Sequence, residues 1–224
     1  QGGFGSAPKF PREPLLFLLL DEAERNNDEE TLSAIQTTLD GMARGGIYDQ
    51  VGGGFHRYST DNEWLVPHFE KMLYNQAHLG RIYLRAWRLT GNPFFQRVTT
   101  QTLDYVLRDM TSPDGAFYSA TDADSEGEEG VFFLWNRQQV REVLSESDAQ
   151  LAIELYDISE NGNFEHSNIL HLPQSLEEYA EQKEMTMAQL HKRVDIIRKQ
   201  LYKAREKREH PIRDDKILTA WNGM

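Results

Sequence analysis

The sequence predicts an all-α fold in which helices pair as hairpins to form part of an (α/α)6 toroid, with a short β-hairpin insertion. Apolar residues recur at helical spacing along most of the chain, a pattern typical of amphipathic helices. Short turns alternate with long glycine-bearing loops, and seven or eight helices are expected, fewer than a complete ring needs. The alternatives are an irregular helical bundle and an α-solenoid, although no repeat of about 34 or 40 residues supports the solenoid.

Local signals place the helices in the first half of the chain. Proline favours the first turn of a helix, and helices are expected to begin at Pro14, Pro67 and Pro93. Asp28 can cap another helix, which a double glycine ends at Gly45. Each expected helix has apolar residues along one face, as packing against a partner helix requires.

The second half begins with a different pattern. Residues 115–135 predict two short strands around an acidic, glycine-bearing loop, and residues 168–173 predict another extended segment. Residues 186–209 predict one long helix whose Lys and Arg residues are solvated, and a further helix is expected to begin at Asp214 and Asp215. Capping-box spacings mark the other helix starts, at Asn136–Gln139, Ser175–Glu178 and Thr186–Gln189.

Composition excludes several classes of protein. The formal net charge of -12 argues against nucleic acid as the main partner, because phosphate binding needs a basic surface. The chain contains no cysteine, and therefore no disulfide, thiolate metal site or cysteine nucleophile. Its longest apolar run, Leu15–Leu20, is too short to cross a membrane, and no signal peptide is visible. We therefore expect a cytoplasmic protein of one domain, residues 1–224, with no membrane or nucleic-acid partner.

Glycines and aromatic residues concentrate between the second and third expected helices. Gly52–Gly54 permit positive φ angles and close backbone approach, but no P-loop or dinucleotide-binding pattern accompanies them. One interpretation is a tight bend that holds Phe55 in the core. The other is a loop that brings His56, Arg57 and Tyr58 over a cleft, where rings and hydrogen-bond donors suit a sugar.

Metal-binding patterns are incomplete. His68 and Glu70 fit the H-x-E of zinc deaminases, but that chemistry needs a cysteine pair, which is absent. Asp122 and Asp124 resemble the start of an EF-hand, yet Phe133 occupies the position of the bidentate glutamate. The sequence therefore predicts no resident metal and no cofactor, although a looser calcium or magnesium site stays open.

Three blocks carry a resemblance to a known family: "GGIYDQVGGGFHRYSTDNEWLVPHFEKMLY", "FYSATDADSEGEEGVFFLW" and "DDKILTAWNGM". They resemble the signature blocks of the YyaL-type, spermatogenesis-associated family of thioredoxin-domain-containing proteins. The resemblance implies a thioredoxin-like domain followed by a six-hairpin (α/α) domain similar to N-acylglucosamine 2-epimerases and glycoside hydrolases. This chain would then be the N-terminal part of the toroid, and the thioredoxin-like domain would be its partner at full length. The resemblance implies a carbohydrate-type cleft more firmly than any reaction.

Two reactions and one non-catalytic alternative stay open for such a cleft. Glycoside hydrolysis needs two carboxyl groups about 5–9.5 Å apart, whereas epimerisation needs a base and an acid on opposite faces of a sugar. The alternative is a binding or scaffolding module that serves the thioredoxin-like domain. The candidate catalytic residues are Glu70, His68, Asp122, Asp124 and Asp215, and the candidate sugar-binding residues are His56, Arg57, Tyr58, Trp64, Tyr74, Trp221 and Asn222.

The order of helices and loops also predicts how they lie in space. The two long loops, residues 45–67 and 115–130, follow alternate helices and are expected at the same end of the hairpins. An incomplete ring should expose apolar helix faces, so self-association is expected. If Glu70 is an acid or base of the cleft, Glu70→Gln should abolish turnover and leave the fold intact.

Overall fold

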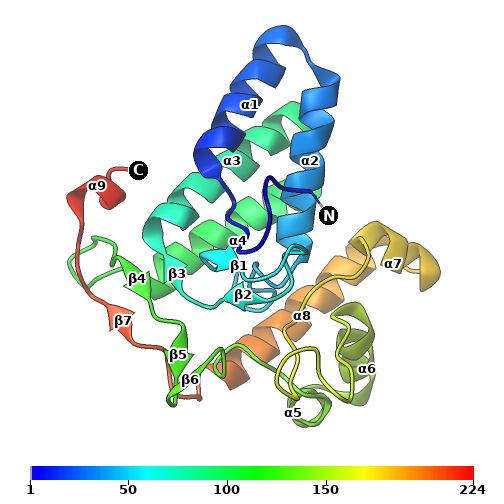
Figure 1. Ribbon diagram of the computed structural model, residues 1–224. Coiled ribbons are helices and arrows are strands. Elements are labelled where there is room, and N and C mark those ends of the chain that lie inside the picture. The colour runs from blue at the N-terminus through cyan, green and yellow to red at the C-terminus, as the bar shows by residue number, and fades with distance from the viewer. Residues whose placement is uncertain (1) are drawn as a thin grey trace.

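The computed structural model describes residues 2–224, and the chain is mainly helical (Figure 1). Within these residues the helices are α1 (Glu13–Asn26), α2 (Glu29–Arg44), α3 (Leu73–Thr90), α4 (Pro93–Asp109), α5 (Arg137–Val143), α6 (Glu146–Leu155), α7 (Leu176–Gln182), α8 (Met187–Arg205) and α9 (Thr219–Asn222). The strands have two residues each and are β1 (Tyr58–Ser59), β2 (Pro67–His68), β3 (Lys71–Met72), β4 (Ala120–Thr121), β5 (Asp124–Ser125), β6 (Glu128–Glu129) and β7 (Arg213–Asp214). The helical fold with a short β-hairpin insertion, here β5–β6, is confirmed.

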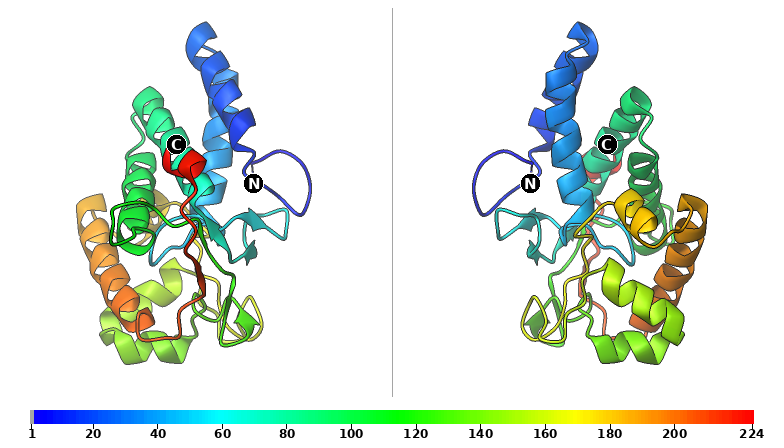
Figure 2. Two further views of the ribbon diagram at one scale, coloured as in Figure 1. Left: turned by 90° about the vertical axis from the view of Figure 1, so that its left-hand side faces the viewer. Right: turned by 90° about the vertical axis from the view of Figure 1, so that its right-hand side faces the viewer.

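Helices α1–α2 and α3–α4 form two hairpins that lie side by side (Figure 1, Figure 2). Helix α1 packs against both α2 and α3, and α3 packs against α4. The fully buried residues of this core include Leu16, Ile35, Leu39, Leu79 and Ile82. Neighbouring hairpins that meet through alternate helices are the arrangement expected of part of an (α/α) toroid, and the predicted fold class is confirmed to this extent.

A second core forms around α8, which packs against α5, α6 and α7. The buried apolar residues of α8 recur every three or four positions: Leu190, Val194, Ile197 and Leu201. This spacing is that of one helix face. The loop of residues 115–130 lies in the chain between α4 of the first core and α5 of the second.

The helix ends follow the local signals of the sequence. All three predicted capping boxes form, at Asn136, Ser175 and Thr186. The Asp28 side chain caps α2, and Gly45 directly follows its last residue. A side-chain oxygen at a cap accepts a backbone N–H that the helix itself leaves unpaired. Short-range hydrogen bonding therefore decides where these helices begin.

Short strands bring the two long loops together. Strand β4 pairs with β3 on one side and β7 on the other, and Thr121 lies opposite both Lys71 and Arg213. Strand β3 follows the loop of residues 45–67, and β4 lies within the loop of residues 115–130. Both loops therefore lie at the end of the hairpin where α3 begins and α4 ends, as predicted.

Two predicted helix starts are wrong. The segment after Pro67 forms β2 and β3, and α3 begins only at Leu73. Every second residue from Pro67 to Leu73 is buried, which is the period of a strand rather than of a helix. Near the C-terminal end, Asp214 belongs to β7, Asp215 follows it in a non-helical segment, and α9 begins at Thr219.

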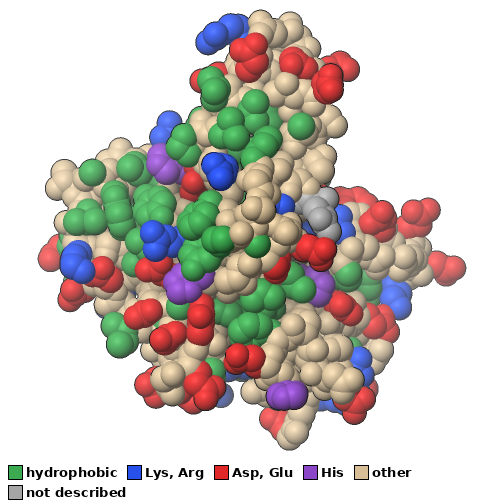
Figure 3. Space-filling view, viewed as in Figure 1, with side chains coloured by type: hydrophobic (Ala, Val, Ile, Leu, Met, Phe, Trp, Pro, Cys, Tyr) green, Lys and Arg blue, Asp and Glu red, His purple; other side chains and the backbone are tan. Residues whose placement is uncertain are grey.

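Large apolar side chains lie exposed around α9. Figure 3 shows apolar side chains gathered over α9 and beside it. Ile217, Leu218, Met224 and, on α3, Leu84 are 37–48% exposed. Self-association through such a surface stays a prediction. Over residues 2–224, no helix combines the length and the apolar character needed to cross a membrane.

Candidate functional site

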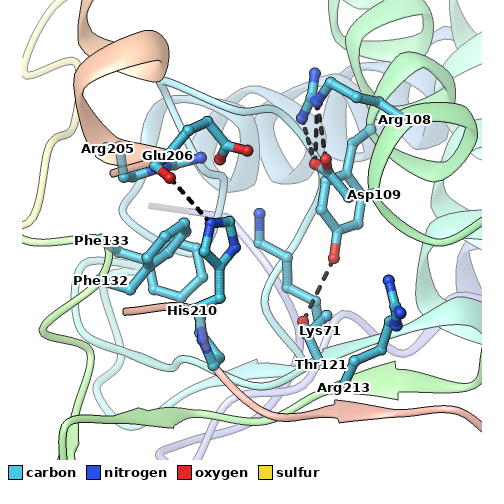
Figure 4. Close-up of a pocket in the computed structure, with 12 residues that line it drawn as sticks. Lys71, Arg108, Asp109, Thr121, Phe132, Phe133, Arg205, Glu206, His210 and Arg213 are labelled. Carbon is cyan, nitrogen blue, oxygen red and sulfur yellow. Dashed lines mark hydrogen bonds and ion pairs between the residues drawn. The ribbon is translucent and has the colours of Figure 1, made fainter. Parts of the chain in front are cut away.

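The described residues form a pocket of about 460 Å³ between the β3–β4–β7 sheet and the C-terminal ends of α4 and α8 (Figure 4). A pocket of this size suits a small molecule. Its lining residues are Lys71, Thr121 and Arg213 of the sheet, Tyr105, Arg108 and Asp109 of α4, Arg205 and Glu206 at the end of α8, and Phe132, Phe133, His210 and Pro211 of the connecting segments.

The sheet directs three polar side chains into this pocket. Lys71, Thr121 and Arg213 are cross-strand partners, and all three line the pocket. Directly opposite residues of a sheet project from the same face, and adjacent residues along a strand project from opposite faces. The same alternation turns Glu70, the residue before Lys71, away from the pocket.

Asp49, Lys71 and Arg205 form a buried ion cluster in the wall of the pocket. The Lys71 Nζ lies 2.8 Å from Asp49 Oδ2, and the two terminal nitrogens of Arg205 each donate to an Asp49 oxygen at 2.9 Å. All three side chains are only 1–4% exposed. Asp49 Oδ1 also accepts the backbone N–H groups of Val51 and Gly52, at 3.0 and 2.9 Å. Mutual pairing allows these charges to stay buried.

Burial and neighbouring charges set the protonation of the cluster. Burial alone would raise the pKa of Asp49, but Arg205 and Lys71 hold that pKa well below its ordinary value. For Lys71, burial outweighs the attraction of Asp49 and, with the repulsion of Arg205, lowers the pKa to about 8. An amine with such a pKa can exchange a proton near neutral pH, as a catalytic acid or base must.

The glycine run brings the backbone close to this cluster. A Cβ atom at Gly52 would overlap the Arg205 guanidinium and lie 2.7 Å from Asp49 Oδ2. The Gly53 carbonyl accepts a hydrogen bond from Lys71 Nζ at 2.9 Å. Phe55 is fully buried, which agrees with the tight-bend interpretation. The bend therefore holds a ring in the core and also lies directly behind Lys71 and Arg205, two residues that line the pocket.

Six of the predicted site residues lie together, but outside the pocket: Arg57, Tyr58, His68, Glu70, Tyr74 and Trp221. Glu70 Oε2 lies 3.0 Å from an Arg57 terminal nitrogen and 3.8 Å from His68 Nε2. Arg57 Nε donates to the Tyr74 hydroxyl at 3.2 Å. The Tyr74 and Trp221 ring centroids are 5.0 Å apart. The sequence blocks do converge here, on a partly exposed surface.

The predicted acidic residues do not join this surface cluster. Asp122, Asp124 and Asp215 are exposed, and no interaction links them to Glu70 within residues 2–224. Glu129, which was not predicted, lies 2.8 Å from His68 Nδ1 through its Oε1. No group of three or more His, Cys, Asp or Glu side chains in this part of the chain could hold a metal ion.

Three predicted sugar contacts have structural roles instead. Trp64 is 0% exposed, and the Lys9 ammonium lies over its ring at 4.4 Å. His56 is 1% exposed, and its Nδ1 lies 2.8 Å from the Phe69 carbonyl oxygen. Because both rings are enclosed by protein, the expectation that they face a cleft is corrected. The Asn222 side chain is bonded to the backbone of Phe117, at 2.7 and 2.9 Å, and so fastens α9 to the second loop.

Glu70→Gln is expected to have a small effect on stability. The Glu70 and Arg57 side chains are 23% and 40% exposed, and a solvent-exposed ion pair contributes less than about 1 kcal/mol. Urea unfolding should therefore show a decrease of that size, and ligand binding in the pocket should not change. A large loss of ligand binding in this variant would show that Glu70 takes part in binding the ligand.

The fold and the pocket define a helical-hairpin protein with a basic, aromatic-walled pocket, and comparisons with known proteins specify it further. No protein-family model matches the chain. Spermatogenesis-associated protein 20 from Homo sapiens is 37% identical over the whole chain, and the protein of that name from Mus musculus is 36% identical. An uncharacterised protein of Caenorhabditis elegans is 35% identical. The chain is homologous over its whole length to these spermatogenesis-associated proteins, which confirms the resemblance carried by its three blocks.

The chain spans about a third of the length of these relatives, 32% of the human protein and 34% of the nematode protein. Among solved structures, a sugar epimerase from a ruminal bacterium matches 58% of this chain and 38% of its own, with a TM-score of 0.49 and 15% identity. A D-mannose isomerase matches 54% of this chain and 30% of its own, with a TM-score of 0.45 and 18% identity.

Proposed function

We propose that the pocket binds a carbohydrate or a similar polyhydroxylated small molecule. The observation that carries this proposal is the combination of rings and hydrogen-bonding groups around one concave space. Tyr105, Phe132 and Phe133 supply aromatic surfaces, while Thr121 and Arg213 supply polar groups from the sheet. Ligand pockets combine apolar walls with a few placed polar groups in this way.

The titratable groups of the pocket favour proton transfer over glycoside hydrolysis. Hydrolysis would use two carboxyl groups. Of the two that line the pocket, Asp109 is bound by Arg108 and accepts the Tyr202 hydroxyl at 3.1 Å, which leaves Glu206 as the one available carboxylate of the lining. Lys71, with its pKa lowered to about 8, and His210 line the same pocket. Epimerisation or isomerisation, in which a base removes a proton from carbon and an acid returns one, needs groups of this kind.

A sugar-binding screen with the protein at full length tests the proposal. We expect at least one monosaccharide or sugar derivative to bind in calorimetric titrations. His210→Ala should weaken that binding by about tenfold, which is about 1.4 kcal/mol, because it removes a side chain that lines the pocket. The fold should be unaffected, because His210 is exposed.

His191→Ala is the matched control, because His191 lies on α8 and does not line this pocket. Binding should be unchanged in the control. The proposal fails if no sugar in the screen binds, or if His210→Ala and His191→Ala bind the sugar as the unmodified protein does.

A further inference from the structure

Lys71 has more hydrogen-bond donors than the protein uses. Its ammonium carries three N–H groups, and two of them have acceptors, Asp49 Oδ2 at 2.8 Å and the Gly53 carbonyl at 2.9 Å. Its other contacts among the described residues are with two aromatic ring faces: Nζ lies 4.3 Å from the centroid of the Tyr105 ring and 5.1 Å from the centroid of the Phe133 ring. Since Lys71 lines the pocket, its third N–H can serve a ligand there.

Arg205 leaves a second buried donor without an acceptor. Its terminal nitrogens are both bonded to Asp49, but its Nε–H has no hydrogen-bond partner within residues 2–224. The residue is 3% exposed and belongs to the same pocket wall as Lys71. Buried donors are almost always paired in proteins, so an unpaired one in a pocket wall points to an acceptor supplied from outside the chain.

The charges around the pocket leave one positive charge without a partner. Lys71 and Arg205 share the single carboxylate of Asp49. Arg108 and Asp109 neutralise each other. At the rim, the exposed Arg213 and the exposed Glu206 contribute opposite charges. Burying an unmatched charge is costly, and it is consistent with the lowered pKa of Lys71.

We propose that the ligand of this pocket carries an anionic group, a carboxylate or a phosphate, that binds between Lys71 and Arg205. The inference rests on the proposed sugar pocket and specifies the charge of the sugar. An anionic oxygen would accept the two unused N–H groups and would match the unpaired positive charge. Figure 4 shows the Lys71 and Arg213 side chains rising toward the same space from β3 and β7, the strands on either side of β4, so Arg213 would assist from the rim.

Calorimetric titration with matched probes tests this inference. The probes are glucose, glucuronate, glucose 6-phosphate and inorganic phosphate, and the protein is used at full length. We expect at least one of the two anionic sugars to bind about tenfold or more tightly than glucose, with a preference that weakens as salt is added. The anionic sugar that binds more tightly identifies the anionic group of the ligand: glucuronate indicates a carboxylate, and glucose 6-phosphate indicates a phosphate.

Two variants assign the preference to this pocket. Lys71→Met, which keeps the length of the side chain and removes its charge, should abolish the preference for the anionic sugar. Arg213→Gln should reduce it about threefold, and its exposed position protects the fold. Arg25→Gln in α1, far along the chain from every pocket residue, is the control. If Lys71→Met does not fold, Arg213→Gln alone decides the assignment.

The outcomes separate this inference from the proposed function. Equal binding of glucose and the anionic sugars would overturn the anionic group and leave the sugar pocket standing. Binding of inorganic phosphate as tightly as glucose 6-phosphate would support the anionic site and overturn the sugar. If none of the four probes binds, the anionic group is overturned, and the wider sugar screen decides the proposed function separately. A preference that Arg213→Gln and Lys71→Met leave unchanged would place the anion elsewhere and overturn the inference.

Discussion

Replacing Asp49 with Asn is expected to lower the unfolding free energy by about 3–5 kcal/mol, the usual cost of removing one partner of a buried ion pair. Asn keeps a carbonyl oxygen that can accept the N–H groups of Val51 and Gly52, so the turn can form. It removes the charge that both Lys71 and Arg205 require. Two cations would then stay buried without an anion. Urea unfolding followed by circular dichroism measures the change.

Two further variants show whether charge is the cause. Asp195→Asn removes the partner of Arg97, but that carboxylate is 57% exposed, so less than about 1 kcal/mol is expected. In the Asp49→Asn background, Lys71→Met removes one of the stranded cations and should restore part of the lost stability. An additive loss in the double variant, or equal losses for Asp49→Asn and Asp195→Asn, would contradict a buried ion cluster.

Features of the fold that depend on neighbours in the sequence were predictable. A cap such as Ser175 bonds to a backbone N–H three residues later, so its effect needs no knowledge of the rest of the chain. The bend at Gly52 was also visible, because glycine tolerates close approach. Which group approaches was not visible, because Arg205 lies far along the chain.

The prediction of a helix after Pro67 failed because tertiary pairing overrode local pattern. The proline and the polar residues behind it fit a first helical turn, but the segment pairs with β1 and β4 instead. The sequence carried a partial signal of a period of two, since the polar His68 and Glu70 alternate with Pro67 and Phe69. That alternation would have turned Lys71 inward and Glu70 outward.

The burial of Arg205 was also indicated by its position in the sequence. The Lys and Arg residues near the end of α8 were expected to be solvated, yet Arg205 falls four positions after Leu201 on the buried face of the helix. A charged residue that continues an apolar face predicts a buried partner. That partner, Asp49, lies 156 residues earlier in the chain, and spacing in the sequence cannot identify it.

The predicted site residues show what residue type alone cannot predict. Conspicuous residues such as His68, Glu70 and Tyr74 do lie together, but residue type alone does not tell a sugar-facing ring from a core ring. Trp64 is buried beneath Lys9, and Glu70 forms an ion pair with Arg57. Of the residues around Glu70 in the sequence, Lys71 lines the pocket, and the rest of the lining comes from distant segments of the chain.

Acidification from pH 6.5 to about 3 is expected to remove about 3–5 kcal/mol of stability through His56 alone. Burial, reinforced by the charge of Lys71 and opposed by that of Asp49, lowers the pKa of His56 from 6.5 to about 3. Between these two values the unfolded chain binds a proton that the folded chain does not, so the unfolding free energy falls as the pH falls. Above pH 6.5 both states hold neutral histidine, and this contribution to the pH dependence disappears.

Comparison with His56→Asn isolates this effect from the other groups that titrate in acid. Asp49 also destabilises the fold once acid protonates it, because its folded pKa is held low, but it is present in both proteins. The variant should be less stable at pH 7, since it loses ring contacts with Phe69 and Phe133. The difference between the two proteins should then shrink or reverse toward pH 3, as only the unmodified protein must keep a buried histidine uncharged.

His166→Asn, at an exposed position, should leave the pH profile as it is. Parallel profiles for His56→Asn and the unmodified protein would show that His56 takes up its proton without unfolding the chain, and would argue against its burial.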